Sequence, residues 1–293
     1  MDAQLIAPTR PVYWSIRREL WENHSILVAP VIVAAVMQFG FLISTMTLRR
    51  RVLSAALDPA KQRAAIEMPL DMTAGLLMLT AFIVGVFYCL DALHGERRDR
   101  SILFWKSLPV SDRTTVLSKA SIPLVILPLL VFALTVTTQL IMLLSSTVKL
   151  LGNEATVVML WTRLPFFQLW IAVLYALVAI ALWHAPIYAW LLLVSAWARR
   201  ATFLWAVFPF LAVAAFEKGA FNTSYVGSFL NYRLLGWFKL AFVPHEHGSV
   251  PIEPLAAITP GKLLSAPDLW IGLVFAALFL AAAVRLRRNR EPI

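Results

Sequence analysis

The stretch "GERRDRSILFWKSLPVSDRTTVLSK" (95–119) separates two of the most apolar segments of the chain, and this contrast decides the fold. It holds six cations and three anions within 25 residues. The apolar runs on either side, 72–90 and 121–144, are each long enough to cross a bilayer, which takes about 20 apolar residues. The pattern predicts two membrane-spanning helices joined by a charged segment outside the membrane.

The composition of the whole chain agrees with a multi-pass membrane protein. Of its 293 residues, 60% are hydrophobic and 14% are charged, whereas a soluble domain carries roughly 25% charged residues. The net charge is +10, but the cations lie at the ends of apolar runs, where they anchor helices to lipid headgroups. We therefore expect membrane lipid, and no nucleic acid, as a partner.

Six apolar runs are predicted to span the membrane, which makes the chain an all-α integral membrane protein. The fourth is too long for a straight span, and Pro186 within it predicts a kink or an extension beyond the bilayer. The fifth is short and contains Pro209, which predicts a tilted or partly re-entrant segment. The six runs are 26–48, 72–90, 121–144, 166–198, 201–216 and 269–284.

The distribution of Lys and Arg predicts a cytoplasmic N-terminus. With that orientation, 15 of the 26 cations fall in the inner segments, and cytoplasmic loops carry an excess of Lys and Arg. The cluster Arg49–Arg51 argues for the opposite orientation. The inner segments would be the N-terminal lead, residues 91–120, the turn at Arg199–Arg200 and the C-terminal tail.

The first 25 residues are predicted to form a separate interfacial element ahead of a six-helix transmembrane domain, 26–293. Pro11 suits a first helical turn, and the segment 10–23 has helical periodicity. We expect this helix to lie in the membrane interface; the alternative is a solvated N-terminal helix. The expected apolar arc is Val12, Tyr13, Ile16 and Leu20, with Trp14 and Trp21 at its edge and Arg18, Glu19 and Glu22 opposite.

The six runs as drawn contain no internal Asp, Glu, Lys or Arg. Ion-coupled carriers and membrane enzymes need such groups at depth, so both classes are disfavoured and the chain is not expected to be an enzyme. His184 is expected to be a packing histidine. Small residues four apart, Ala81 and Gly85 in the second run and Gly272 and Ala276 in the sixth, predict close helix packing.

No motif for a cofactor or metal is evident. Gly261–Lys262 lacks the upstream glycine of a phosphate-binding loop, so the chain is not expected to hydrolyse ATP. His245 and His247 lie two apart, but a metal site needs further ligands at suitable spacing. The energy for any uphill transport would therefore have to come from another protein.

The charged stretch has its own predicted local structure. Glu96–Arg100 is expected to form a solvated turn, and 101–108 a short helix that Pro109 ends. Ser111 or Asp112 would be the N-cap of the next helix. One face of the short helix would carry Ile102, Trp105 and Leu108.

The order E-R-R-D-R-S-I-L-F-W-K-S-L-P-V-S, followed by Lys119, resembles the region after the second helix of ABC-2-type transporter permeases. The chain departs from the family at Arg100, where the family often has Gly, and in the bulkier Trp105–Lys106. The layout of the whole chain also resembles that of the family. The matching residues are Glu96, Ser107, Leu108, Pro109, Val110, Ser111 and Lys119.

The resemblance implies a permease subunit of an ATP-driven exporter in a bacterial cytoplasmic (inner) membrane. It further implies a homodimer or heterodimer of permeases joined to two ATP-binding subunits, with 95–119 as the coupling helix. The plainer alternative for this stretch is an ordinary positive-inside loop. The residues expected to couple to the ATPase partner are Glu96, Arg97, Arg98, Asp99, Arg100, Ile102, Trp105, Leu108 and Pro109.

The outer loop 217–268 is too long and too apolar for a plain connector. Its segment 225–242 has helical spacing and predicts short helices that dip back toward the bilayer, with Trp237, Phe238 and Phe242 as an external gate. The aromatic spans favour a hydrophobic or amphipathic solute. The alternative function is a nucleotide-independent membrane carrier or an assembly scaffold.

Overall fold

A computed structural model describes residues 11–54, 59–103, 110–150, 161, 165–242 and 255–289. The described residues are almost entirely helical, as the sequence predicts. The helices are α1 (Pro11–Glu22), α2 (Ser25–Ser54), α3 (Pro59–Ala92), α4 (His94–Arg98), α6 (Asp112–Ser121), the π-helix η1 (Ile122–Ile126), α7 (Leu127–Leu150), α9 (Phe166–Trp197), α10 (Thr202–Phe221), α11 (Tyr225–Ala241), α12 (Pro260–Ser265) and α13 (Pro267–Asn289).

Six helical stretches within the described residues are long and apolar enough to cross a membrane, as the six apolar runs predict. Each overlaps one of the six apolar runs. Large apolar side chains cover their outer faces: Phe39, for example, is 66% exposed and Phe87 is 62% exposed. The stretches are Ser25–Met46, Glu67–Arg98, Asp112–Lys149, Phe166–Trp197, Thr202–Phe221 and Pro267–Asn289.

Several of these helices are longer than a bilayer requires. The stretch Asp112–Lys149 has 38 residues, which is about 57 Å of helix at 1.5 Å per residue, against a hydrocarbon core of about 30 Å. It is continuous because α6, η1 and α7 follow one another, with the π-turn at Pro123. The fourth run is likewise one helix that passes through Pro186. A part of the bundle therefore projects beyond the membrane.

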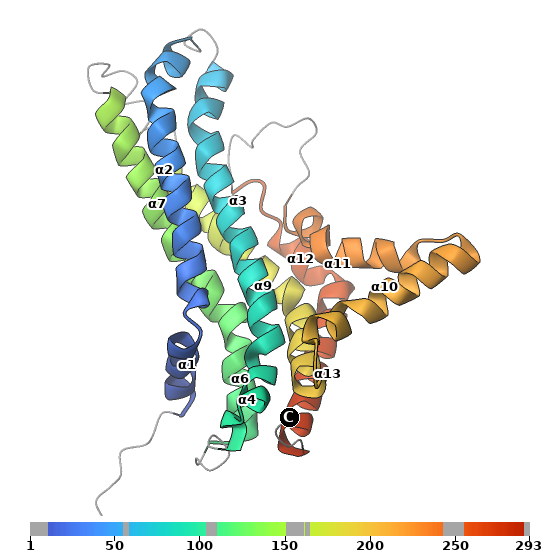
Figure 1. Cartoon of the computed structure of the whole chain (residues 1–293). Helices are drawn as coiled ribbons and strands as arrows, with labels where there is room; N and C mark the ends of the chain where they lie inside the picture. Colours follow the sequence, from blue (N-terminus) through green and yellow to red (C-terminus); the bar gives the residue numbers. More distant parts are fainter. Residues whose placement is uncertain are drawn as a thin grey trace, which may run out of the picture.

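Figure 1 shows α2, α3 and α7 running side by side, with α9 and α13 packed together beyond them. Helices α1, α4 and α6 and the C-terminal end of α13 gather at one end of the bundle, here called the network end. The C-terminal end of α9 is there too, since His94 Nε2 lies 3.4 Å from the Arg199 carbonyl oxygen. The four segments predicted to share one side of the membrane therefore share one end of the molecule.

Small residues permit close approach between helices, as their spacing predicts. A Cβ on Gly85 in α3 would lie 3.0 Å from Tyr188 Cε1 in α9 and 3.3 Å from Pro123 Cβ. A Cβ on Gly272 in α13 would lie 2.0 Å from Arg233 Nη2 of α11. These two glycines let a neighbouring side chain occupy the space next to the helix backbone.

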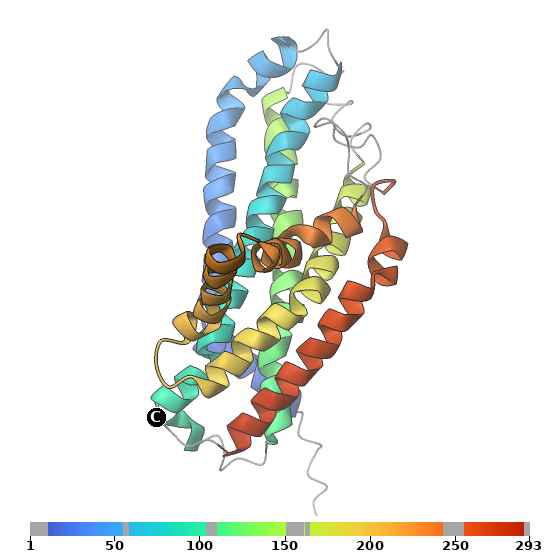
Figure 2. The same ribbon diagram turned by 90° about the vertical axis from the view of Figure 1, so that its right-hand side faces the viewer.

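Helices α10 and α11 form a hairpin that projects sideways from the bundle (Figures 1 and 2). The Glu217 carboxylate of α10 accepts hydrogen bonds from the Thr223 hydroxyl and the Val226 N–H, both at 2.8 Å, and so satisfies donors at the start of α11. At the bundle, Trp183 Nε1 donates to the Arg233 carbonyl at 2.9 Å. The segment 225–242, predicted to form short helices, contains one continuous helix of 17 residues, α11.

Candidate functional site

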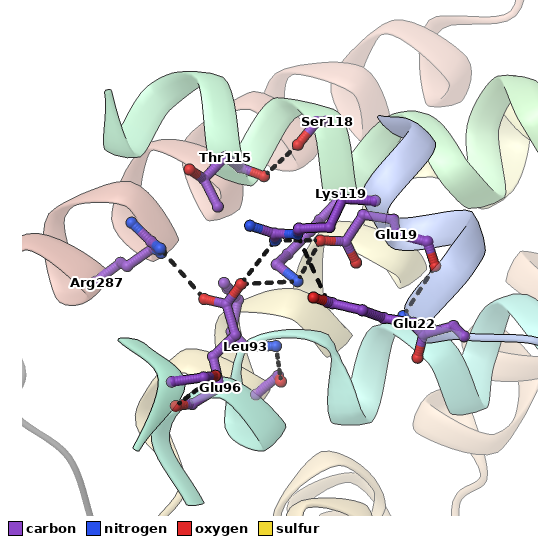
Figure 3. A network of polar contacts seen from close by, with 12 residues as sticks. Glu19, Glu22, Leu93, Glu96, Thr115, Ser118, Lys119 and Arg287 are labelled. Atoms are coloured by element: carbon purple, nitrogen blue, oxygen red, sulfur yellow. Dashed lines mark hydrogen bonds and ion pairs between the residues drawn. The ribbon is translucent and has the colours of Figure 1, made fainter. Parts of the chain in front are cut away.

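Six ionised side chains from four helices meet at the network end, far apart in sequence but joined by ion pairs (Figure 3). Three are carboxylates and three are cations, and a further carboxylate, Glu22, lies at the edge of the group, 3.5 Å from Arg18 Nε. The six are here called the ion network. Its members are Arg18, Glu19, Glu96, Asp112, Lys119 and Arg287.

Glu19 of α1 is at the centre of one half of the network. Its Oε1 lies 2.6 Å from Arg18 Nη2 and 2.8 Å from Lys119 Nζ. Its Oε2 accepts a hydrogen bond of 2.7 Å from the hydroxyl of Tyr88 in α3. These contacts hold the N-terminal helix against both α3 and α6.

Glu96 of α4 is at the centre of the other half. Its Oε1 lies 3.0 Å from Arg18 Nη2 and 3.2 Å from Lys119 Nζ, and its Oε2 lies 3.2 Å from Arg287 Nη2 in α13. Arg287 also pairs with Asp112 at the start of α6. The short segment after α3 is therefore bonded to three other helices through a single carboxylate.

Most of the network is shielded from solvent by the protein. The side chains of Glu19, Lys119, Arg287 and Glu96 are 0%, 2%, 3% and 6% exposed. Buried ions are tolerated when they are paired and hydrogen-bonded, whereas removing one partner leaves a buried charge and costs about 3–5 kcal/mol. The network therefore keeps the four helices in one arrangement, and changing one pair disturbs all of them.

The environment shifts the pKa values of the network residues on α1. Burial alone would raise the pKa of Glu19, but the charges of Lys119 and Arg18 and the hydrogen bonds from Lys119 and Tyr88 outweigh it, so its pKa is lowered. For Arg18, burial would lower the pKa, but Glu19 and Glu96 outweigh it and raise the pKa. Both groups are therefore charged at neutral pH.

The corner between α3 and α4 is clamped by the C-terminal end of α9. The backbone N–H groups of Leu93 and His94 donate to Ser195 Oγ at 3.0 and 2.9 Å. Arg97 Nη1 donates to the carbonyl oxygens of Ala196 and Ala198 at 2.9 and 3.1 Å. Arg97 thus satisfies carbonyls at the end of α9 that have no partner within the helix.

The prediction that Glu96–Arg100 is a solvated turn is wrong for its first two residues. Glu96 and Arg97 are 7% and 4% exposed because their charges find buried partners in α1, α6, α9 and α13. Arg98, Asp99 and Arg100 are exposed, as predicted, and Arg100 adopts a left-handed backbone conformation with φ 59°.

The short helix predicted at 101–108 is seen only at its start. Residues 101–103 are helical, and Ile102 is 2% exposed, with its side chain buried in the bundle. The prediction of Ser111 as an N-cap is confirmed, because its hydroxyl accepts the Thr114 N–H at 3.1 Å. Trp105, Leu108 and Pro109 lie outside the described residues.

The orientation predicted for α1 is wrong in part. Glu19 was placed opposite the apolar arc but is 0% exposed, on the side of α1 where Ile16 packs against the core. Glu19 follows Ile16 by three residues and Val12 by seven, so helical spacing itself puts it beside the arc. No local pattern shows that Lys119 supplies its partner there.

The statement that the spans lack charged residues also needs correction. The membrane-length helices are longer than the apolar runs, and they include Glu67, Lys119 and Arg287. These residues are 3%, 2% and 4% exposed. Lys119 and Arg287 lie at the network end, where the runs as drawn had already stopped.

The three residues predicted as an external gate lie together, with Tyr175 of α9. The ring centroids of Trp237 and Phe238 are 5.7 Å apart, those of Phe238 and Phe242 are 5.5 Å apart, and those of Tyr175 and Phe242 are 5.7 Å apart. Trp237 and Phe242 are partly buried against α9, while Phe238 is 55% exposed. The cluster joins the end of α11 to the bundle.

His184 is a packing residue, in agreement with the sequence-based interpretation. It is 4% exposed, and its ring nitrogens lie 3.0 Å from the Ile180 carbonyl oxygen and 3.1 Å from that of Leu234. Among the described residues no three His, Cys, Asp or Glu are grouped to hold a metal ion. His245 and His247 lie outside that part of the chain.

Comparison with known proteins finds no matching family model, no similar curated protein and no similar solved structure.

Proposed function

We propose that this chain is the membrane-spanning permease subunit of an ATP-driven exporter of the ABC-2 type. It would lie in a bacterial inner membrane with the network end in the cytoplasm. It would work as a homodimer or heterodimer with two separate ATP-binding subunits, which carry ATP and Mg²⁺. The observation that supports this most is the position of Glu96, which joins the charged segment after α3 to α1, α6 and α13.

The proposal divides the charged segment into two faces with different roles. Arg98, Asp99 and Arg100 face solvent and would contact the ATP-binding subunit. Glu96 and Arg97 face the bundle and would transmit the movement. Because Glu96 pairs with cations of three helices, a displacement of α4 has to move those helices or break buried ion pairs.

The aromatic cluster of α11 would be the external gate in this proposal. Trp237 and Phe238 are on α11, and Phe242 directly follows it as the C-cap, where the hairpin meets the bundle. Replacing Phe238 by Ala should raise leakage of solute, because the gate loses one of its rings. ATPase stimulation should stay unchanged, because the ring is half exposed and its loss should leave the fold intact.

The first test is to find a neighbouring gene for a P-loop ATPase without membrane spans, and to co-purify its product with this chain. Replacing Arg98, Asp99 and Arg100 together by Ala should abolish co-purification without lowering stability, because these side chains are exposed. Glu96→Gln should retain the partner but lose stimulated ATP hydrolysis. The matched control is Lys149→Ala, an exposed cation at the other end of α7.

Retention and stimulation of the ATPase by the triple variant would overturn the coupling role of this segment. Solute movement by the purified chain without nucleotide would instead favour the carrier alternative. Orientation is tested by Arg98→Cys, since the single native cysteine, Cys89, is buried. A membrane-impermeant thiol reagent should label this variant only in inverted vesicles, and labelling of intact cells would place the network end outside.

A further inference from the structure

A pocket of about 470 Å³ lies between α7 and the start of α9. This volume is within the range of about 300–1,000 Å³ that small-molecule sites occupy. The pocket is on the half of α7 away from the ion network, so it belongs to neither the coupling segment nor the aromatic cluster of α11. Its lining residues are Leu140, Leu143, Trp161, Pro165, Phe166, Phe167, Gln168 and Trp170.

The walls of the pocket are apolar, and their indole donors are already used. Trp161 Nε1 donates to Thr147 Oγ1 at 3.0 Å, and Trp170 Nε1 donates to Gln139 Oε1 at 2.9 Å. No lining residue is charged. Gln168 supplies the one side-chain amide of the lining, and its Oε1 is buried without a hydrogen-bond partner among the described residues. Apart from this acceptor, the site offers ring surfaces and aliphatic groups, which suit an uncharged chain and would penalise a buried ion.

The pocket belongs to the apolar part of two membrane-length helices. Leu140 and Leu143 lie in the predicted span 121–144, and Phe166, Phe167 and Trp170 lie in the predicted span 166–198. Both helical stretches are long and apolar enough to cross a membrane. The lining is therefore on segments suited to lipid, on the half of α7 away from the ion network.

The exposed side of the pocket carries large apolar rings. Phe167 is 77% exposed and Trp161 is 43% exposed. Trp161 packs edge-on against Phe166, with ring centroids 5.9 Å apart, and Phe167 packs edge-on against Trp170 at 5.5 Å. Two aromatic pairs thus border the pocket, and such rings on a membrane-length helix suit contact with lipid.

We infer that this pocket binds one acyl chain of a bilayer lipid from the leaflet opposite the network end. The lipid is favoured over a dissolved solute because the lining is on membrane-length helices and has no charged anchor. Lipid binding at this site does not depend on coupling to an ATPase, so it can be tested independently of the proposed function.

The probe is a phosphatidylcholine that carries a diazirine on one acyl chain, present at trace level in nanodiscs with the full chain. After illumination, peptide mapping should find labelling concentrated on 140–143 and 165–170, and excess unlabelled lipid should reduce it. Leu140→Trp fills the pocket, so the acyl chain can no longer pack against its apolar walls. This labelling should therefore fall about tenfold. Leu144→Trp is the matched control, since Leu144 is 56% exposed and outside the pocket.

Even labelling along the exposed face of α7, or equal labelling of the Leu140→Trp and Leu144→Trp variants, would overturn the inference. Competition by a dissolved hydrophobic solute but not by phosphatidylcholine would overturn the lipid as occupant. If Leu140→Trp does not fold, Phe167→Ala is the variant to test. Phe167 is largely exposed, so its replacement should leave the fold intact, and it takes an apolar ring away from the mouth of the pocket. It should lower lipid labelling, and unchanged labelling would count against the site.

Discussion

Lys119 and Glu19 form a buried ion pair, with 2.8 Å between Nζ and Oε1, although 100 positions separate them in the sequence. Their side chains are 2% and 0% exposed. The pair joins the N-terminal helix to the helix that follows the charged segment. Because Glu96 also lies 3.2 Å from Lys119 Nζ, one ammonium group holds two carboxylates from two distant parts of the chain.

Replacing Lys119 by Met should therefore destabilise the protein strongly. Glu19 and Glu96 would lose a shared cation in a buried site, at a cost of about 3–5 kcal/mol. Chemical unfolding in detergent, followed by tryptophan fluorescence, measures this change. Lys149→Met, at an exposed position of the same membrane-length helix, should stay within about 0.5 kcal/mol of the native protein; equal effects of the two variants would contradict a structural role for the network.

The lowered pKa of Glu19 predicts a loss of stability on acidification. Its folded-state pKa lies below the unfolded value, which is about 4.3 for Glu. Its stabilising contribution is therefore complete above that unfolded value and is lost as the pH falls through the folded value. The difference in unfolding free energy between the native protein and Glu19→Gln should shrink between neutral and strongly acidic pH.

Glu22 on the same helix provides the control for this pH dependence. Burial raises its pKa, although Arg18 opposes the shift, so its carboxylate is disfavoured in the folded state and its effect has the opposite sign. Glu22→Gln should leave the stability at neutral pH unchanged or slightly higher. A parallel pH dependence for Glu19→Gln and Glu22→Gln would show that Glu19 does not contribute in this way.

Gly85→Val should destabilise the contact between α3 and α9. The new Cβ would lie 3.0 Å from Tyr188 Cε1, and overpacking of this kind costs about 1–3 kcal/mol. Gly75→Val is a matched control on the same helix, because a Cβ there has no atom within 4 Å. The midpoint of thermal unfolding in detergent should fall for the first variant only; a similar fall for both would indicate a general effect of valine in α3.

Arg97→Met and Arg98→Met should differ although the residues are neighbours. Arg97 donates to two carbonyl oxygens at the end of α9, and leaving buried groups unpaired costs about 1–3 kcal/mol. Arg98 has a side chain that is 57% exposed, so its loss should change stability by less than about 0.5 kcal/mol. Hydrogen exchange at the α3–α4 corner should increase only in Arg97→Met, and faster exchange in both would contradict the clamp.

Local patterns were sufficient for much of the fold. Apolar runs long enough for a bilayer predicted the six membrane-length helices, because that signal depends only on composition over about 20 residues. The N-cap at Ser111 and the helix start at Pro11 were predicted for the same reason: capping depends on residues within one turn. The spacing around Gly85 predicted close packing but did not identify Tyr188 as the neighbour.

The site was less accessible from local patterns. The sequence directed attention to Glu96 and Lys119, but it placed Glu96 in solvent and Glu19 on the outer face of α1. Both are buried in the structure. The ends of the helices were also missed, because the runs were drawn where charges begin, whereas the helices include Lys119 and Arg287, whose charges are paired inside the bundle.

The amino-acid sequence by itself determined that this chain is a helical protein with six segments able to cross a membrane, since the length of an apolar run and its ends are local properties. Only the tertiary structure decided which charges are buried and which face solvent. A carboxylate leaves water when cations from other helices replace its hydration, and those cations, Arg18, Lys119 and Arg287, come together with Glu96 only when the whole bundle has formed.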